Sequence, residues 1–386
     1  MPPTELQLRI ALTMIPDVGP ITAKNLIQNL GSVHAIFGES RENLMRIRGI
    51  GPRLSAAITS SRLMEAAAKE EAFIARHRIK VSYYQDPDYP RRLKQCEDGP
   101  ILLYSHGTDC LNAAKILSVV GTRRATFYGK ETCRELIGGL ASLFGDLVIV
   151  SGLAYGIDVA AHRAALENGL PTAAVLGHGL STIYPRVHRE TAKTISRQGA
   201  LVTDFHSGMG PEKNNFLRRN RIIAGLSDAV LVIESGETGG ALITADLAGS
   251  YSREVMAVPG RISDQRSKGC NDLIKDNAAA MVTSPEDIAC ILKWQTPEMM
   301  EYPTLFRASS FTPPEKKILC LIGEAPGITP EAISQRTDTP IHTVLSMLVE
   351  MELKAWVAVL PGNRYMLKTK PSWDPENRNN MLFNIV

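Results

Sequence analysis

The chain has few cysteines, six in 386 residues, and no close pair among them. None of their spacings is that of zinc ligands or of a redox-active pair, and isolated thiols are typical of a reducing compartment. No run of about 18 apolar residues is present, and the N-terminus lacks a charged segment followed by a continuous apolar run. These absences argue against a disulfide-stapled, secreted or membrane-spanning chain, and we expect a cytoplasmic protein.

A strong excess of one charge is also missing. The formal net charge is +3, so any nucleic-acid partner must meet a local basic surface. The hydrophobic fraction of 44% and the charged fraction of 22% are those of a globular protein. The length predicts two or three domains.

Two nucleotide-binding motifs are absent. The ATP-binding pattern GxxxxGK followed by Ser or Thr does not occur, because Gly129-Lys130 precedes Glu131 and lacks the earlier glycine. The turn Gly121-Thr122-Arg123 has one glycine, so the GxGxxG fingerprint of dinucleotide-binding proteins is missing as well. We therefore expect no cofactor, and we expect no metal site.

Short apolar runs alternate with helical stretches through the middle of the chain. Such alternation predicts βαβ units and a doubly wound parallel sheet, whose buried strands are near-continuously apolar. The predicted strands are Ile116–Val120, Leu147–Ser151, Thr172–Leu176, Ala200–Thr203, Ala229–Glu234, Val255–Val258 and Met281–Thr283.

The composition and the hydrophobic pattern of the sequence change at several points, which predicts separate domains. The predicted parts are a helical domain at 1–80, a connecting segment packed on the core at 81–114, the sheet domain at 115–296, a linker at 297–312, a winged-helix domain at 313–370 and a tail at 371–386.

Two glycine turns in the helical domain form a weak repeat, at Gly19-Pro20 and at Gly51-Pro52. They resemble tandem helix-hairpin-helix motifs, whose turn amides and helix N-termini can hold a DNA phosphate without reading sequence. The alternative is a small helical domain in which the glycines only permit tight turns. The residues leave both interpretations open.

The winged-helix prediction rests on three helical stretches followed by a hairpin. The third stretch, Ile341–Leu348, carries no arginine or lysine. Because a recognition helix needs polar or basic side chains to meet DNA, contact with a protein is at least as well supported as groove reading.

Glycine and small polar residues follow the predicted strands, at Gly121-Thr122, Ser151-Gly152, Gly177 and 234–240. In a doubly wound sheet these loops meet along one edge, where ligands bind. Backbone amides and helix N-termini there favour a ligand that bears phosphate.

Cations gather at the same edge. Arg123 and Arg124 follow the first predicted strand, and the stretch 213–221 interleaves Lys213 and three arginines with Phe216. This combination neutralises a phosphate backbone and stacks a base. A charge cluster can also be only a solvated helix face, but its place at the sheet edge favours a binding role.

Ordered motifs across the sheet domain resemble the DprA family (DNA processing protein A, also called Smf). They are Ser118–Arg123, Ser151–Asp158 with Ala161-His162, Val175–Gly177 with Ile183–Pro185, Phe216–Ser227, Gly240–Ala245 and Ala257–Gly260. The resemblance implies an α/β fold with an extended Rossmann-like doubly wound parallel sheet, flanked by a small N-terminal helical domain and a C-terminal winged helix. It also implies a homodimer that binds and protects single-stranded DNA and loads RecA on it during natural transformation.

Carried over by position, the DNA site of the family falls on a defined set of residues. Arg123, Lys213 and Arg221 would neutralise phosphates, and Phe216 would stack on a base. The implied DNA-binding residues are Gly121, Thr122, Arg123, Ser151, Gly152, Lys213, Phe216, Arg219, Asn220 and Arg221, with the amides of Gly121, Thr122 and Gly152 as donors. The sequence leaves open whether Arg219 faces DNA or packs. Leu217, where many members have proline, and Thr238, where many have serine, depart from the family pattern.

Several other functions have to be weighed. Asp158 and His162 are spaced i and i+4, and we interpret them as residues that brace the Ser151-Gly152 turn. A metal site or an acid–base pair is the alternative, but no third metal ligand is evident. Glu234 and Glu237 suggest an alternative, hydrolysis of small nucleotide derivatives as by phosphoribohydrolases. A second alternative is a scaffold that binds a recombinase and touches DNA weakly. We expect a binding protein without catalytic residues.

Overall fold

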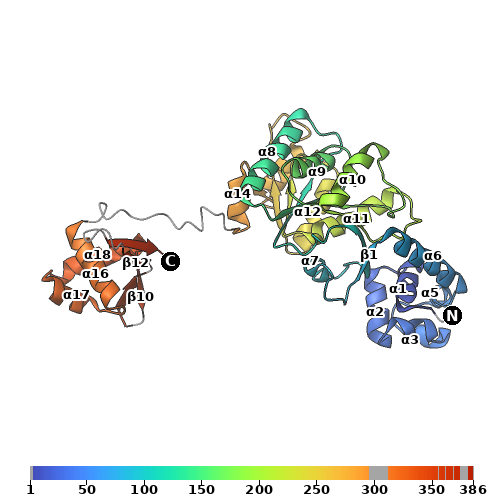
Figure 1. Ribbon diagram of the computed structural model, residues 1–386, viewed down its shortest axis with the longest axis horizontal. Coiled ribbons are helices and arrows are strands. Elements are labelled where there is room, and N and C mark those ends of the chain that lie inside the picture. Colours follow the sequence, from blue (N-terminus) through green and yellow to red (C-terminus); the bar gives the residue numbers. More distant parts are fainter. Residues whose placement is uncertain are drawn as a thin grey trace. The chain divides into compact units, whose positions relative to one another are not determined.

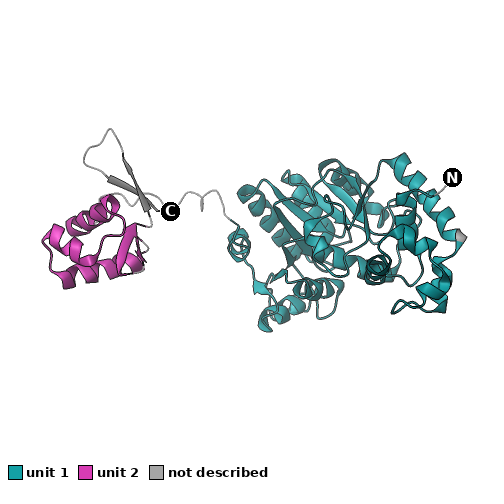
Figure 2. Ribbon diagram, turned by 90° about the horizontal axis from the view of Figure 1, so that it is seen from below, with its two compact units in different colours: residues 1–294 teal, residues 295–386 magenta. Residues whose placement is uncertain are grey.

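The computed structural model describes residues 3–294, 312–354, 356–360 and 362–367, and the strands at 369–373 and 381–385. The chain divides into two compact units, residues 1–294 and 295–386, drawn in teal and magenta in Figure 2. Most of the predicted linker lies outside the described residues, as does Pro361 within the predicted winged-helix domain. Among the described residues, no helix is long and apolar enough to cross a bilayer.

A nine-stranded sheet forms the centre of the first unit. It contains six of the predicted strands at nearly the predicted bounds, whereas the strand predicted at Met281–Thr283 is the shorter β9, which ends at Met281. Its order is β1-β2-β6-β5-β4-β3-β7-β8-β9, with parallel pairing from β6 to β9. The bounds of its strands are β1 Lys80–Tyr83, β2 Leu102–Gly107, β3 Lys115–Val120, β4 Leu147–Ser151, β5 Thr172–Val175, β6 Ala200–Thr203, β7 Ala229–Val232, β8 Glu254–Ala257 and β9 Ala280–Met281. The strand order reverses at β3, which pairs with β4 on one side and β7 on the other.

Helices cover both faces of the sheet, as the apolar strands require (Figure 1). One face carries α7 (Arg91–Lys94), α11 (Lys213–Leu226), α12 (Gly240–Ser250) and α13 (Lys268–Lys275). The other carries α8 (Phe127–Leu143), α9 (Ile157–Glu167) and α14 (Pro285–Ile291). Helix α10 (Arg189–Gln198) packs Ala192 and Ile195 beside β5 and β6.

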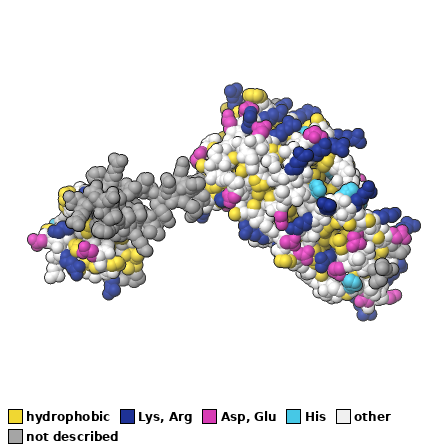
Figure 3. Space-filling model, viewed as in Figure 1, with side chains coloured by type: hydrophobic (Ala, Val, Ile, Leu, Met, Phe, Trp, Pro, Cys, Tyr) yellow, Lys and Arg dark blue, Asp and Glu magenta, His cyan; other side chains and the backbone are white. Residues whose placement is uncertain are grey.

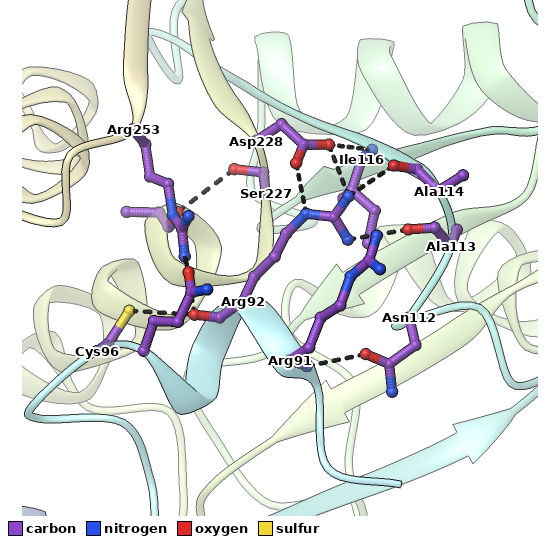
Figure 4. A network of polar contacts seen from close by, with 12 residues as sticks. Arg91, Arg92, Cys96, Asn112, Ala113, Ala114, Ile116, Ser227, Asp228 and Arg253 are labelled. Carbon is purple, nitrogen blue, oxygen red and sulfur yellow. Dashed lines mark hydrogen bonds and ion pairs between the residues drawn. The ribbon is translucent and has the colours of Figure 1, made fainter.

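The predicted connecting segment contributes β1 and β2, which lengthen the sheet by antiparallel pairing. Figure 4 shows how an ion pair fastens this segment to the sheet: Arg92 Nε lies 2.6 Å from Asp228 Oδ1. The same guanidinium donates to the carbonyl oxygens of Ala113 and Ala114, and the amide of Ile116 donates to Asp228. Because Ile116 is the second residue of β3 and Asp228 precedes β7, this network fixes the amino-terminal ends of those strands, opposite to the site described below.

The N-terminal part is helical, as predicted. Its helices are α1 Glu5–Met14, α2 Pro20–Leu30, α3 Val33–Gly38, α4 Arg41–Leu44, α5 Pro52–Ile58 and α6 Ser61–His77. Gly19 and Gly51 are the N-caps of α2 and α5, and a proline follows each at the first helical position. Glu70 of α6 accepts a hydrogen bond of 2.8 Å from the amide of Ser207, which ties the helices to the loop after β6.

The second unit has the three helices and the hairpin of a winged helix. The elements are α16 Pro313–Glu324, α17 Pro330–Thr337, α18 Ile341–Leu353, β10 Val357–Leu360 and β11 Arg364–Leu367. Ile318, Val344 and Trp356 are buried among them. In the predicted tail region, β12 (Thr369–Trp373) pairs antiparallel with β13 (Met381–Ile385).

Candidate nucleic-acid interface

A cavity of about 530 Å³ opens at the carboxyl ends of β3 and β7, where the strand order reverses. This is the position at which doubly wound sheets bind ligands. The loop after β3 and the loop after β7 form two of its walls, and the N-terminal turns of α11 form a third. Seven of the predicted DNA-binding residues line it: Gly121, Thr122, Arg123, Lys213, Phe216, Arg219 and Asn220.

A cation and a second aromatic ring both lie close to the ring of Phe216. The Cζ atom of Arg123 is 5.4 Å from the centroid of the Phe216 ring, and the Tyr184 ring is 5.6 Å away at 44°. Gly177 makes room for this ring, because a Cβ there would lie 2.7 Å from Cδ1 of Phe216. Sequence reasoning had not assigned Tyr184 to the site, although Tyr184 belongs to one of the quoted motifs.

The turn after β3 is shaped by close packing. A Cβ at Gly121 would lie 2.5 Å from Cγ1 of Ile157, so only glycine fits. The amide of Thr122 donates to the Glu234 carbonyl oxygen at 2.7 Å. The prediction that this amide binds a phosphate is therefore wrong for the present geometry, and the exposed Arg123 side chain is the cation that this turn presents to the cavity.

Arg219 is buried, and it contributes to the lining of the cavity. Its guanidinium donates to the Val175 carbonyl oxygen, and a Cβ at Gly152 would overlap it. Burial lowers the pKa of Arg219 to about 10, although the nearby Asp158 carboxyl favours its charged form. Arg219 is therefore a packing residue that also contributes to the cavity lining. Gly152 does not line the cavity, and its missing side chain makes room for the Arg219 guanidinium.

Ser151 and Arg221 do not reach the cavity, contrary to prediction. The buried hydroxyl of Ser151 donates to the Val119 carbonyl oxygen at 2.6 Å. The Arg221 guanidinium forms an ion pair with Asp204 and donates to the Asp98 carbonyl oxygen, and its side chain is only 10% exposed. Because these partners use the guanidinium, Arg221 is a packing residue in this structure.

Asn220 lines the cavity and is anchored to the loop after β7. Its Nδ2 donates to the Gly240 carbonyl oxygen at 3.2 Å. Lys213, at the first turn of α11, is exposed at the rim. Lys213 and Arg123 thus supply exposed positive charge at the cavity, whereas the charge of Arg219 is buried.

Asp158 and His162 have structural roles, because each forms a hydrogen bond within the fold. Asp158 accepts a hydrogen bond of 3.4 Å from the amide of Ala154, and burial raises its pKa. The hydroxyl of Thr172 donates to Ile149, so His162 Nδ1 donates to that hydroxyl at 2.7 Å. Burial lowers the pKa of His162 to about 3. Within the described part of the chain, no group of three metal-ligating side chains occurs.

The two glutamates of the hydrolase alternative do not line the cavity. Buried Glu234 accepts a hydrogen bond of 2.9 Å from the amide of Thr126, just before α8. Glu237 is exposed and pairs with Lys268 at 2.7 Å. Among the described residues that line the cavity, Asp158 alone carries a carboxyl group.

These residues lie at the switch point of a Rossmann-type sheet, and they suit an anionic ligand that also offers a flat face for stacking. Three family models match the chain. They are DNA recombination-mediator protein A over residues 80–293, a helix-hairpin-helix motif over 8–61 and the DprA winged helix domain over 304–363. The chain belongs to the DprA family of DNA-processing recombination proteins, which confirms the predicted family and fold class.

Individual relatives agree with this assignment. Protein Smf of Escherichia coli is 37% identical over 290 residues, which cover 72% of this chain and 75% of the relative. Protein Smf of Synechocystis is 31% identical over 392 residues and covers 92% and 97%. Among solved structures, DNA processing protein A from Streptococcus pneumoniae has a TM-score of 0.63 at 32% identity, covering 75% of this chain and 98% of its own.

The corresponding protein of Helicobacter pylori has been described in its single-stranded DNA binding mode. It has a TM-score of 0.50 at 28% identity and covers 55% of this chain and 96% of its own.

Proposed function

We propose that this chain holds single-stranded DNA in the sheet-edge cavity, with an unpaired base on Phe216 and phosphates on Arg123 and Lys213. The placement of the Phe216 ring at the cavity, beside Arg123, is the observation that carries the proposal. A base takes the ring face that the guanidinium covers, and the guanidinium moves onto the adjoining phosphate. Because bases of a duplex are already stacked, the ring selects single strands.

The biological role follows from this binding and from the family. The chain protects incoming single strands and loads a RecA-type recombinase on them during natural transformation. RecA acts on DNA in the cytoplasm, so the proposed function places this protein there. The alternative in which the chain is a scaffold with weak DNA contact predicts that cavity variants leave RecA loading unchanged.

We also propose that the chain acts as a homodimer. Two identical sites related by a two-fold axis let one particle hold two strands or two segments of one strand. Static light scattering of the full chain at micromolar concentration tests this, and a mass of one chain contradicts it.

Two assays test the role itself. In the first, purified chain is mixed with a labelled oligonucleotide and a single-strand nuclease, and we expect the oligonucleotide to survive. In the second, RecA filaments are assembled on single strands coated with a single-strand-binding protein, and we expect the chain to speed assembly. Phe216→Ala should lose both effects, and Phe127→Ala, an exposed phenylalanine outside the cavity, should keep them.

A further inference from the structure

A second hollow, of about 350 Å³, lies where the N-terminal helices meet the sheet domain. Its lining shares no residue with that of the DNA cavity. The end of α6, strands β2 and β6 and the loop after β5 all contribute to it. Its volume falls within the range of about 300–1,000 Å³ that is usual for ligand sites.

Four apolar side chains form one part of the lining. Ile79 and Leu201 are buried, whereas Phe73 and Leu180 are only half-buried. The Phe73 ring is stacked on the imidazole of His77, with centroids 4.1 Å apart and planes at 22°. The half-buried ring and the half-buried leucine leave an apolar surface that one large side chain of another molecule can cover.

Three basic side chains complete the lining, and all of them are exposed. They are Arg76 and His77 of α6 and His106 of β2. No residue that the structure describes forms an ion pair or a hydrogen bond with any of these side chains. The described lining contains no carboxyl group. Figure 3 shows Lys, Arg and His side chains on the face of the first unit where the N-terminal helices meet the sheet domain.

The end of α6 does not by itself account for this basic rim. Arg76 and His77 lie in the last turn of the helix, where positive charge is favoured. That turn is already closed by the amide of Ile79, which donates to the Ile74 carbonyl oxygen at 3.1 Å. His106 belongs to a different element, so the cations come from two elements around one apolar surface.

The carboxylates nearest to these residues in the chain have other partners. Glu70 accepts hydrogen bonds from the loop after β6, and Glu71 accepts one of 2.7 Å from the hydroxyl of Thr4. Asp109, just beyond β2, pairs with Lys80 at 2.9 Å. The positive charge of the hollow is therefore available to another molecule.

We propose that this hollow docks an acidic segment of a partner protein, with an aromatic side chain against Phe73 and Leu180 and carboxylates on Arg76 and His106. An apolar centre inside a polar rim is the usual anatomy of a protein interface, and a basic rim selects an acidic partner. A small molecule is accommodated less well, because none of the charged or polar side chains in the described lining is buried and able to fix its orientation.

The hollow and the DNA cavity share one loop. Leu180 and Tyr184 both belong to the loop after β5, and the first lines the hollow whereas the second lines the cavity. A protein docked by an acidic segment is therefore held beside the proposed DNA site. The proposal goes beyond the proposed function and stands without it.

Three labelled peptides test the chemistry of the hollow by fluorescence anisotropy with the full chain. They are Asp-Asp-Phe-Asp-Asp, the same peptide with Ala in place of Phe, and Lys-Lys-Phe-Lys-Lys. We expect the acidic phenylalanine peptide to bind and the other two to bind at least about tenfold more weakly, because each lacks one half of the recognition. Equal binding of the three peptides, or no binding of the first, would overturn the proposal.

Two charge reversals on one helix locate the binding site. Arg76→Glu replaces an attraction by a repulsion of similar size, so it should weaken binding of the acidic phenylalanine peptide by about tenfold. Arg62→Glu, at an exposed position of α6 outside the hollow, is the matched control and should bind as the unaltered protein does. Thermal melting shows whether each variant is folded. If Arg76→Glu is not, Arg76→Gln replaces it, with an expected loss of about threefold.

Equal affinities of the Arg76 variant and the control would overturn the proposal. A final titration adds saturating oligo-dT to the peptide complex of the unaltered protein. We expect the peptide to stay bound and the Arg76 variant to bind oligo-dT normally. Displacement of the peptide by oligo-dT would show that the hollow belongs to the DNA surface and would also overturn the proposal. Failure of the unaltered protein to bind oligo-dT, with the peptide still bound, would refute the proposed function alone.

Discussion

The guanidinium of Arg123 lies over the ring of Phe216, with 5.4 Å between Cζ and the ring centroid. A cation over an aromatic face is attracted to it by about 0.5–1 kcal/mol at an exposed site. Because this attraction is weak, a base can displace the guanidinium from the ring when a strand binds.

Removing the ring tests base stacking. Phe216→Ala should weaken single-strand binding by about 1–3 kcal/mol, whatever the sequence of the strand, because every base has a face to stack. Fluorescence anisotropy with a labelled oligonucleotide measures the loss. Phe127→Ala serves as the control, and equal affinities of the two variants would contradict a stacking role.

Removing the cation tests phosphate binding. Arg123→Ala should weaken single-strand binding. It should also make the slope of log K against log salt shallower by about 0.7, because one phosphate contact with a single strand is lost. Its neighbour Arg124 does not line the cavity, so Arg124→Ala should leave the slope unchanged. A slope unaltered by Arg123→Ala excludes this side chain as a phosphate contact.

The sequence predicted the sheet well because buried parallel strands are continuous apolar runs, as in β4 and β7. It predicted poorly which way the arginines of α11 point. Arg219 and Arg221 are cations in a basic stretch, yet one is buried against Val175 and the other against Asp204. These partners are 44 and 17 residues away in the chain, so no local pattern reveals them.

The packing role of Arg221 makes a prediction about stability. Its ion pair with Asp204 is nearly buried, and breaking it leaves a carboxylate without its counter-charge. Arg221→Met should therefore lower the free energy of unfolding by about 3–5 kcal/mol. Urea denaturation measures this, with exposed Arg218→Met as a control that should cost much less. If Arg221→Met is as stable as the control but binds DNA poorly, the phosphate role is correct instead.

Acid should destabilise the fold through His162. Its folded-state pKa is lowered from 6.5 to about 3 by burial, with Arg219 and His188 adding to the effect. Between these pH values the unfolded chain binds a proton that the folded chain does not, so stability falls as pH falls, by up to about 1.4 kcal/mol per pH unit.

Denaturation at pH 7 and pH 5 should show this loss in the unaltered protein and a smaller loss in His162→Gln. The raised pKa of Asp158 acts in the opposite direction and is common to both proteins. Equal losses in the two proteins would show that His162 is not the titrating group.

Catalysis is not expected from this site. Glu234 holds the start of α8 and Glu237 pairs with Lys268, so neither carboxylate meets a ligand in the cavity. We predict no hydrolysis of nucleotides or DNA strands, with or without magnesium. Release of a free base from a nucleoside monophosphate with turnover, lost in Glu234→Gln or Glu237→Gln, would establish the hydrolase alternative.

The central claim is that the sheet-edge cavity, with the ring of Phe216 in its lining, selects single strands. The most direct measurement is the affinity of the full chain for one sequence as a single strand and as a duplex, at several salt concentrations. We predict that the single strand binds much more tightly at every salt concentration, because only its bases can reach Phe216, and that its affinity falls linearly with log salt. Equal affinities for the two forms, or binding that does not respond to salt, would contradict the account.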